Sequence, residues 1–394
     1  MRIAVVTREF PPFTSYTGGI GRHFSALVVE LVRQGHAVEV LTVTRTGARI
    51  AEHGGARVHL LQRPNPDRLW FVEEVGWTLT VERNLSRLGR FDIVLAPEWG
   101  GEASRYSARR RSGPLVTQLT TSLVQVLEIA PMWRRTRRMR LRHRLQAPLE
   151  RRQTERSDGI MASSHAILDW TRRLWDIDGI PAAVVPNMVE PDSIGAAATG
   201  EPPPGFPAEG PVVAFAGRLE IRKGVHILAE AMRLVWEEVP EAHLVLVGRD
   251  GDWQGGRMSA HLRAVAGARS DRLHILGNQP PERLYPALRA ADVIAFPSLW
   301  ENFSLGSMEA MALGRPIVVT SGSGFDDFFT DEHDSLMVPP GEHEPLARAI
   351  VRLLGDPPLR SRLSDRVLQT IQRYRPEPVT RQHLEFFEQV AGRP

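Results

Sequence analysis

The chain has no cysteine among its 394 residues, which excludes disulfide bonds and thiolate metal sites. It also lacks any uninterrupted apolar run near the roughly 18 residues that a membrane-spanning helix needs. Its N-terminus, Met1-Arg2, is charged too early for a signal peptide and predicts a first strand instead. The composition, 42% hydrophobic and 24% charged, is that of a globular protein, and the length predicts two domains. We therefore expect a cytoplasmic protein, with peripheral contact at the inner membrane face as a further option.

Lysine is almost absent, because Lys223 is the only one in the chain. All other formally cationic side chains apart from histidine are arginine, which indicates a general composition bias. A single lysine against that background suggests a position where a guanidinium cannot replace a compact ammonium group.

Positive charge is concentrated in the first half. Residues 1–190 carry 28 Arg against 19 acidic residues, whereas the remainder carries 21 Lys plus Arg against 27. Much of the excess lies between Arg134 and Arg156, where Leu141, Leu145 and Leu149 recur every four residues and predict an amphipathic helix. Its basic face is either simply solvated or a surface for anionic lipid or an acidic acceptor. We expect no nucleic acid, because no recognised binding module accompanies the charge.

Apolar segments of strand length alternate with helical patterns in both halves, which predicts two doubly wound α/β domains. A Pro- and Gly-rich stretch at 191–211 predicts the linker between domains at 1–190 and 212–378, and the last segment, 379–394, predicts a helix that crosses back to the first domain. Loops follow the strands at one rim of each sheet, where open α/β sheets bind ligands. Two such rims imply a cleft between the domains.

Several loops of the first half are candidates for ligand contact. Gly18 and Gly19 precede a helix, where glycine either serves a turn or permits close approach of a ligand. Glu98 and Trp99 follow a strand at 91–96, and Thr120 follows a strand at 115–119. Because ligands bind at the carboxyl ends of strands in open sheets, Glu98 and Trp99 are candidate binding residues, and Thr120 should line the same edge of the domain.

In the second half, Arg218 and Lys223 lie in a glycine-flanked loop after the strand 212–216. Either this is a surface loop, or the two cations hold a diphosphate, the arginine by a fork of hydrogen bonds and the lysine as a point charge. The position of the loop on the rim favours the second interpretation.

The stretch 296–316 predicts a strand, a loop and a short helix capped by Ser304. The backbone N–H groups of Phe303, Ser304 and Leu305 would then be free to hold a phosphate. Glu301 and Glu309 either complement the helix dipole or grip sugar hydroxyls on the two sides of that phosphate. Two cations and two carboxylates on one rim favour the second interpretation.

These motifs resemble the retaining, nucleotide-sugar-dependent glycosyltransferases of the GT-B fold, family 4. The resemblance rests on Gly217-Arg218 with Lys223-Gly224, on Val247-Gly248, and on the two glutamates of Glu301-Asn-Phe-Ser-Leu-Gly-Ser-Met-Glu309. In the first half it rests on Pro11-Pro12 with Gly18-Gly19. It implies two Rossmann-like domains that face each other across a cleft.

The resemblance also implies roles. Arg218 and Lys223 would neutralise the donor diphosphate, Glu301 would hold the transferred sugar, and Glu309 would hold the ribose. The catalytic set would be Arg218, Lys223 and Glu301, and the donor-binding set would be Gly18, Gly19, Arg218, Lys223, Gly248, Glu301, Asn302, Phe303, Ser304, Leu305 and Glu309. The acceptor side would include Tyr16, Glu98, Trp99 and Thr120. The donor would be a UDP-, GDP- or dTDP-type sugar, the acceptor a hydroxyl on a glycan, a lipid or a small natural product, and no metal ion would be needed.

The sequence departs from the family at Thr120, where the family usually has a histidine. We interpret this as an altered donor, such as a 6-deoxysugar. Two rival functions are a non-catalytic GT-B-like protein that binds a nucleotide or a partner, and a sugar-nucleotide epimerase. Retention of Arg218, Lys223 and both glutamates argues against the first, and the spacing of the glutamates argues against the second.

Overall fold

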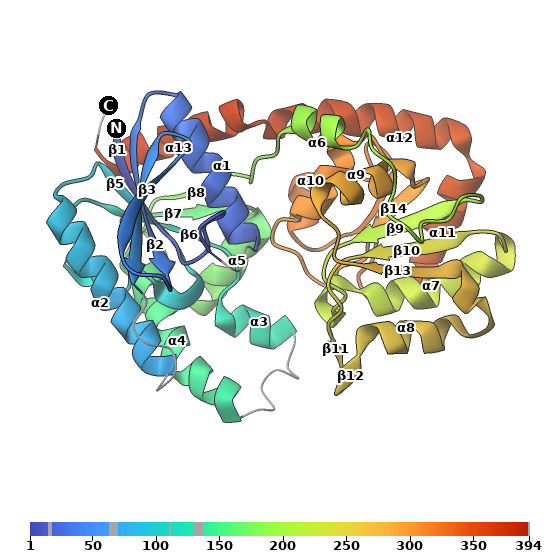
Figure 1. Ribbon diagram of the computed structural model, residues 1–394, viewed down its shortest axis with the longest axis horizontal. Coiled ribbons are helices and arrows are strands. Elements are labelled where there is room, and N and C mark those ends of the chain that lie inside the picture. Colours follow the sequence, from blue (N-terminus) through green and yellow to red (C-terminus); the bar gives the residue numbers. More distant parts are fainter. Residues whose placement is uncertain (15–17, 63–69, 110–111, 130–136, 393–394) are drawn as a thin grey trace. The chain divides into compact units, whose positions relative to one another are not determined.

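The computed structural model describes residues 1–14, 18–62, 70–109, 112–129 and 137–392, with the backbone alone at 70–73, 137–140 and 142–143. It divides into two compact units, Met1–Met188 with Pro376–Pro394, and Val189–Arg375. Each unit is built on its own mainly parallel sheet with helices on both faces (Figure 1). The predicted pair of doubly wound α/β domains is therefore confirmed.

The sheet of the first unit has eight strands in the order β3-β4-β2-β1-β5-β6-β7-β8. All neighbours pair in parallel except β3, an edge strand that pairs antiparallel with β4. The strands are β1 Arg2–Val6, β2 Ala37–Thr44, β3 Arg49–His53, β4 Ala56–Gln62, β5 Ile93–Pro97, β6 Leu115–Gln118, β7 Gly159–Ala162 and β8 Ala182–Val184. The helices are α1 Gly19–Arg33, α2 Trp70–Leu88, α3 Leu123–Ile129, α4 Arg137–Glu155, α5 His165–Leu174 and α13 Pro376–Val390.

Strand β1 is apolar from Ile3 to Val6 because both faces of the sheet are covered there. Alternate side chains of a strand point to opposite faces, and both faces of this sheet are covered. Ile3 and Val5 pack in a core with residues of α1 and α13, whereas Ala4 and Val6 pack in a second core with Trp77 of α2. Neither face of the strand can therefore be polar.

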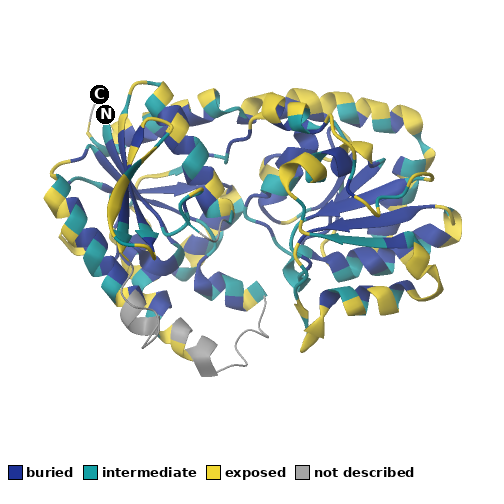
Figure 2. Cartoon of the chain, viewed as in Figure 1, coloured by how far each residue is buried: buried dark blue, intermediate teal, exposed yellow. Residues whose placement is uncertain are grey.

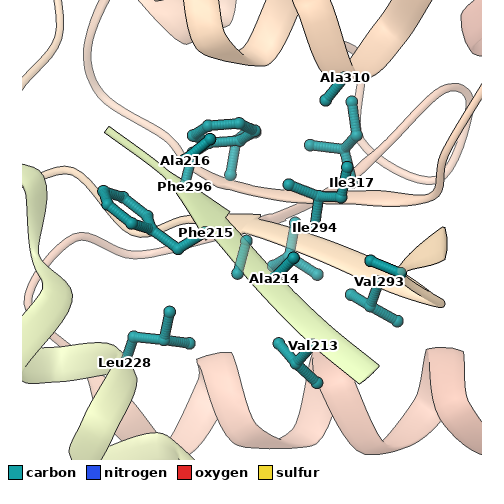
Figure 3. Close-up of a cluster of buried hydrophobic side chains, with 14 of the residues drawn as sticks. Val213, Ala214, Phe215, Ala216, Leu228, Val293, Ile294, Phe296, Ala310 and Ile317 are labelled. Carbon is teal, nitrogen blue, oxygen red and sulfur yellow. The ribbon is translucent and has the colours of Figure 1, made fainter. Parts of the chain in front are cut away.

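The sheet of the second unit has six parallel strands in the order β13-β10-β9-β14-β15-β16. The strands are β9 Val212–Ala216, β10 His243–Val247, β13 Leu273–Gly277, β14 Val293–Phe296, β15 Ile317–Thr320 and β16 Leu336–Val338, and a separate small hairpin comprises β11 Asp252–Trp253 and β12 Gly256–Arg257. The helices are α6 Pro191–Ala197, α7 Val225–Glu238, α8 Met258–Ala266, α9 Pro281–Ala290, α10 Leu305–Ala312, α11 His343–Gly355 and α12 Pro357–Thr370. Figure 3 shows β9 between Leu228 of α7 and Ala310 of α10, in one continuous core.

The stretch 191–211 differs from the predicted linker. The structure assigns it to the second unit, and its first part forms α6, with Pro191 at the first position, where proline favours a helix. Ile194 is buried in the core of this unit, and Phe206 packs against that core. These apolar contacts hold in the second unit a segment whose composition alone indicated a linker.

The final helix α13 belongs to the first unit, where it packs against α1. It begins at Pro376, three residues before the predicted boundary at 379. Burial is concentrated in the strands, and the helices expose their outer faces (Figure 2). Among the described helices, none has both the length and the apolar character required to cross a bilayer.

Candidate functional site

The strand order of the second sheet reverses direction between β9 and β14. From β9 the chain winds outward through β10 to β13, then returns to place β14 on the other side of β9. The loops that follow β9 and β14 therefore diverge, and such a switch point is where open α/β sheets bind ligands. Lys223 lies in the first of these loops and Glu301 in the second.

Lys223 and Glu301, both expected on this rim, contact each other at the switch point. The ammonium group of Lys223 donates to Oε2 of Glu301. Arg222 Nη1 donates to Oε1 of the same carboxylate at 3.2 Å. Glu301 is 5% exposed, so one buried carboxylate holds two cations.

The electrostatics of the cluster favour its ionised form. Burial alone would raise the pKa of Glu301, but the charges and hydrogen bonds of Lys223 and Arg222 overcome it and lower that pKa to about 2. Burial lowers the pKa of Lys223 from its ordinary value, and Glu301 opposes that change. The site thus keeps a desolvated ammonium group next to a carboxylate that does not protonate at neutral pH.

Arg218 occupies a different position from the one expected. Its Nη1 lies 3.1 Å from Oε2 of Glu220, and its side chain is 42% exposed. Glu220 also accepts from Arg222 Nη2 at 3.2 Å. The structure therefore brings Lys223 and Glu301 together, places Arg222 between Glu220 and Glu301, and leaves Arg218 at the outer end of this chain of charges.

Sequence reasoning missed Arg222. Among the many arginines of the chain nothing in its residue type distinguishes it, but its place beside Lys223 is a usable signal. Residues Ile221–Lys223 form a 3₁₀ turn, and from it the side chains of Arg222 and Lys223 both reach the loop that carries Glu301. Arg222 Nη1 also donates to the carbonyl oxygen of Trp300 in that loop.

Two glycines hold the loop that carries Glu301. A Cβ on Gly224 would lie 1.7 Å from the carbonyl oxygen of Pro297, and one on Gly324 would lie 1.7 Å from that of Asn302. The Gly324 N–H also donates to the carbonyl of Glu301 at 2.8 Å. The loop backbone therefore lies so close to positions 224 and 324 that only glycine fits at either one.

Helix α10 begins as predicted. Ser304 is its N-cap, and the Ser304 hydroxyl accepts from the N–H of Ser307 at 3.3 Å. Gly314 follows the helix with φ of 62°, a left-handed conformation that suits glycine at a helix end. Phe303 is buried against Phe328, with ring centroids 4.7 Å apart, and this packing fixes the start of the helix. The first N–H groups of a helix have no intrahelical acceptor, so this end can hold an anion.

Glu309 lies in α10 and is 3% exposed. Its Oε1 accepts from the hydroxyl of Tyr285 of α9 at 3.2 Å. Gly248, at the end of β10, has a structural reason to be glycine, because a Cβ there would lie 1.8 Å from the carbonyl oxygen of Gly217. Within the described ranges, no three His, Asp or Glu side chains are grouped so as to hold a metal ion.

The first sheet has its own switch point, between β1 and β5. Gly18 is the N-cap of α1, which begins at Gly19, and the Gly18 N–H donates to Glu9 Oε2 at 2.9 Å. Glu98 and Trp99 directly follow β5. Tyr16, predicted on the acceptor side, lies outside the described residues.

Glu98 and Thr120 lie side by side in the first unit. The Thr120 N–H donates to Glu98 Oε2 at 3.3 Å, while Glu98 Oε1 has no hydrogen-bond partner within the described part of the chain. Glu98 is fully buried, and burial together with the nearby charge of Glu150 raises its pKa well above the ordinary value. Glu150 in turn accepts from the backbone of Gly100 and Leu123, at 2.9 Å each, and so ties together the loops that follow β5 and β6.

Comparison with known proteins agrees with this geometry. Residues 17–193 match the family described as Glycosyltransferase Family 4, and residues 210–356 match Glycosyl transferases group 1. The chain is 29% identical to a phosphatidyl-myo-inositol mannosyltransferase of Mycobacterium leprae, over 99% of this chain and 97% of the relative.

Two solved structures share the fold over 99% of this chain. Sucrose-phosphate synthase from Thermosynechococcus elongatus has a TM-score of 0.79 at 22% identity, with 99% of its own chain covered. HepE from Anabaena, in complex with UDP and glucose, has a TM-score of 0.66 at 17% identity, with 100% of its chain covered. The two matched families together cover well over half of the sequence, so the chain belongs to the family 4 glycosyltransferases, with the GT-B fold.

Proposed function

We propose that this glycosyltransferase moves a sugar from a nucleoside diphosphate donor to a hydroxyl group of its acceptor, with retention of the anomeric configuration. The observation that carries the proposal is the cluster that Lys223 and Arg222 form around the buried Glu301 at the switch point of the second sheet. With Arg218 and Glu220 the cluster has three cations against two carboxylates, and this excess of positive charge beside the start of α10 suits a diphosphate.

The reaction breaks the bond between the anomeric carbon and a phosphate oxygen, and forms a bond from that carbon to the acceptor oxygen. The acceptor's proton passes to an oxygen of the departing diphosphate, so no dedicated base is required. Lys223 and the arginines stabilise the negative charge that develops on the leaving group. In this proposal fixed cations serve where other transferases use a metal ion.

Glu301 and Glu309 would bind hydroxyl groups on the two sides of the diphosphate. Glu309, held by Tyr285, would take the ribose, and Glu301, held by two cations, would take the transferred sugar. Asn302, Phe303, Ser304 and Leu305 would offer backbone N–H groups to a phosphate. In the first unit, Gly18 and Gly19 would contact the diphosphate. Glu98, Trp99 and Thr120 would lie on the acceptor side. Thr120 would also favour a donor whose sugar is a 6-deoxysugar.

A UDP-type donor is supported by the neighbour HepE, whose structure holds UDP and glucose. GDP- and dTDP-type donors belong to the same proposal. The relative from Mycobacterium leprae is named for a lipid acceptor, phosphatidyl-myo-inositol, which makes an amphiphilic acceptor the first to test. Helix α4, within the basic segment 134–156, would then meet an anionic membrane surface.

The test is a thermal-shift screen against UDP, GDP, ADP and dTDP. Binding to the folded state adds about 2.7 kcal/mol at a hundredfold excess over Kd, which gives a clear rise in Tm. Glu309→Ala is expected to weaken the shift from every nucleotide. Glu301→Gln, measured against its own baseline, is expected to keep the nucleotide shift but lose the extra shift from the matching nucleotide sugar. Equal loss of nucleotide binding in both variants would refute the division of roles.

A further inference from the structure

A cavity in the first unit lies between α2, the turn at Tyr106–Ala108 and α4, away from the strand ends described above. Its volume is about 230 Å³, well above the roughly 10–15 Å³ that one water needs. Helices α2 and α4 contact each other beside it (Figure 1). Its lining combines apolar and cationic side chains: Val75, Thr78, Ser104, Arg105, Ala108, Arg109, Leu149 and Arg152.

The cavity carries excess positive charge. Arg105 Nε and Arg109 Nη1 donate to the two oxygens of the buried Glu82, at 2.8 and 2.7 Å. Each guanidinium has five N–H donors, so each keeps donors for a ligand. Arg152 is exposed and forms no ion pair with any residue that the structure describes. Three guanidinium groups therefore line the cavity, and two of them share the single carboxylate of Glu82.

The lining also contains an unsatisfied hydroxyl group. Ser104 is 1% exposed, and within the described ranges its Oγ has no hydrogen-bond partner. A buried polar group without a partner costs about 1–3 kcal/mol, which an acceptor on a ligand would recover. The cavity thus offers one hydroxyl donor and several guanidinium donors, a combination that suits the oxygens of a phosphate group.

We propose that this cavity binds the phosphate group of a phosphate ester, with Ser104, Arg105, Arg109 and Arg152 as donors. The apolar walls, Val75 and Leu149, suit the part of the ester that carries carbon chains. Val75 is 48% exposed and Leu141, two helical turns before Leu149, is 44% exposed, so apolar surface continues outside the cavity. An anionic phospholipid headgroup has this chemistry, as does a soluble phosphate ester, and the inference does not depend on the transferase reaction.

The test uses the full chain with two probes and three variants. The probes are vesicles of phosphatidylcholine with or without phosphatidylglycerol, and soluble glycerol phosphate measured by calorimetry. Arg152→Gln and Ser104→Ala remove groups that have no partner in the described structure, so neither is expected to affect folding. Arg151→Gln is the matched control, because Arg151 is an exposed neighbour on α4 that pairs with Glu155 outside the cavity lining.

Arg152→Gln and Ser104→Ala are each expected to weaken binding about tenfold, with Arg151→Gln close to wild type. Binding to anionic vesicles alone would identify the ligand as a lipid headgroup, and comparable binding of glycerol phosphate would identify a soluble ester. Failure of the wild type to bind either probe, or an equal loss in Arg151→Gln and Arg152→Gln, would overturn the inference. The rise in Tm that nucleotides induce should be unchanged in all three variants. Failure of this inference can therefore be distinguished from failure of the proposed donor site.

Discussion

The buried pair of Lys223 and Glu301 allows a quantitative prediction. Lowering the pKa of Glu301 from its ordinary value of 4.5 to about 2 corresponds to about 3 kcal/mol of preference for the charged form. Two cations share that carboxylate, so we expect about 1–2 kcal/mol of coupling between Lys223 and Glu301. Little of it should be lost to solvent screening, because Glu301 is 5% exposed.

The assay is a double-mutant cycle in urea with Lys223→Met, Glu301→Gln and the double variant. Glu301→Gln alone should cost about 3 kcal/mol at pH 7, because it leaves the half-buried Lys223 without its counter-charge, while Arg222 keeps Glu220. The double variant should be less unstable than the sum of the single ones by the coupling energy. A coupling below about 0.5 kcal/mol would refute the buried ion pair.

The same pair predicts a pH dependence with a definite sign. Because the pKa of Glu301 is lower in the folded than in the unfolded state, its contribution is complete above pH 4.5 and is lost as pH falls towards 2. The stability difference between wild type and Glu301→Gln should therefore shrink between pH 5 and pH 3. A difference that stays constant over that range would contradict the assignment.

Three further predictions concern single positions. Burial raises the pKa of Glu98, so folding takes up a proton there, and the contribution of Glu98 to stability falls as pH rises above 4.5. Glu98→Gln should therefore raise the urea midpoint at pH 8 but not near pH 4. A lower urea midpoint of the variant at pH 8 would refute this. Gly324→Ala should abolish the nucleotide-induced thermal shift because its Cβ would meet backbone at 1.7 Å, whereas Gly355→Ala, with open space, should retain it. Arg218→Gln should weaken nucleoside diphosphate binding but change the free energy of unfolding by no more than about 0.5 kcal/mol. Arg222→Gln should both weaken that binding and destabilise the fold. Equal stability of the two variants would contradict their different burial.

Much of the fold could be predicted from the sequence because the central strands are buried on both faces. Such strands read as short continuous apolar runs, as in Val212–Ala216 and Val293–Phe296. The start of α10 could be predicted because a serine cap and a glycine stop act locally. The edge hairpin β3–β4 was not predicted, and its exposed strand β3 lacks that apolar signal.

Other features depend on contacts between distant residues, which no local pattern reports. The stretch 191–211 joins the second unit because Ile194 and Phe206 meet a core formed by strands far along the chain. Glu98 was predicted as a ligand contact, but its burial beside Glu150 arises from the packing of α4. The pairing of Lys223 with Glu301 could be anticipated because both follow strands at the switch point, whereas the residue type of Arg222 does not distinguish it from the many other arginines and only its place beside Lys223 does.

The central claim is that Lys223 receives the departing diphosphate. It is tested most directly by measuring nucleoside diphosphate release from UDP-, GDP- and dTDP-sugars, with and without a lipid or sugar acceptor. The wild type should release the nucleotide from at least one donor, and Lys223→Met should lower that rate at least about a hundredfold while the protein stays folded. A folded Lys223→Met variant that turns over donor as fast as the wild type would contradict the claim.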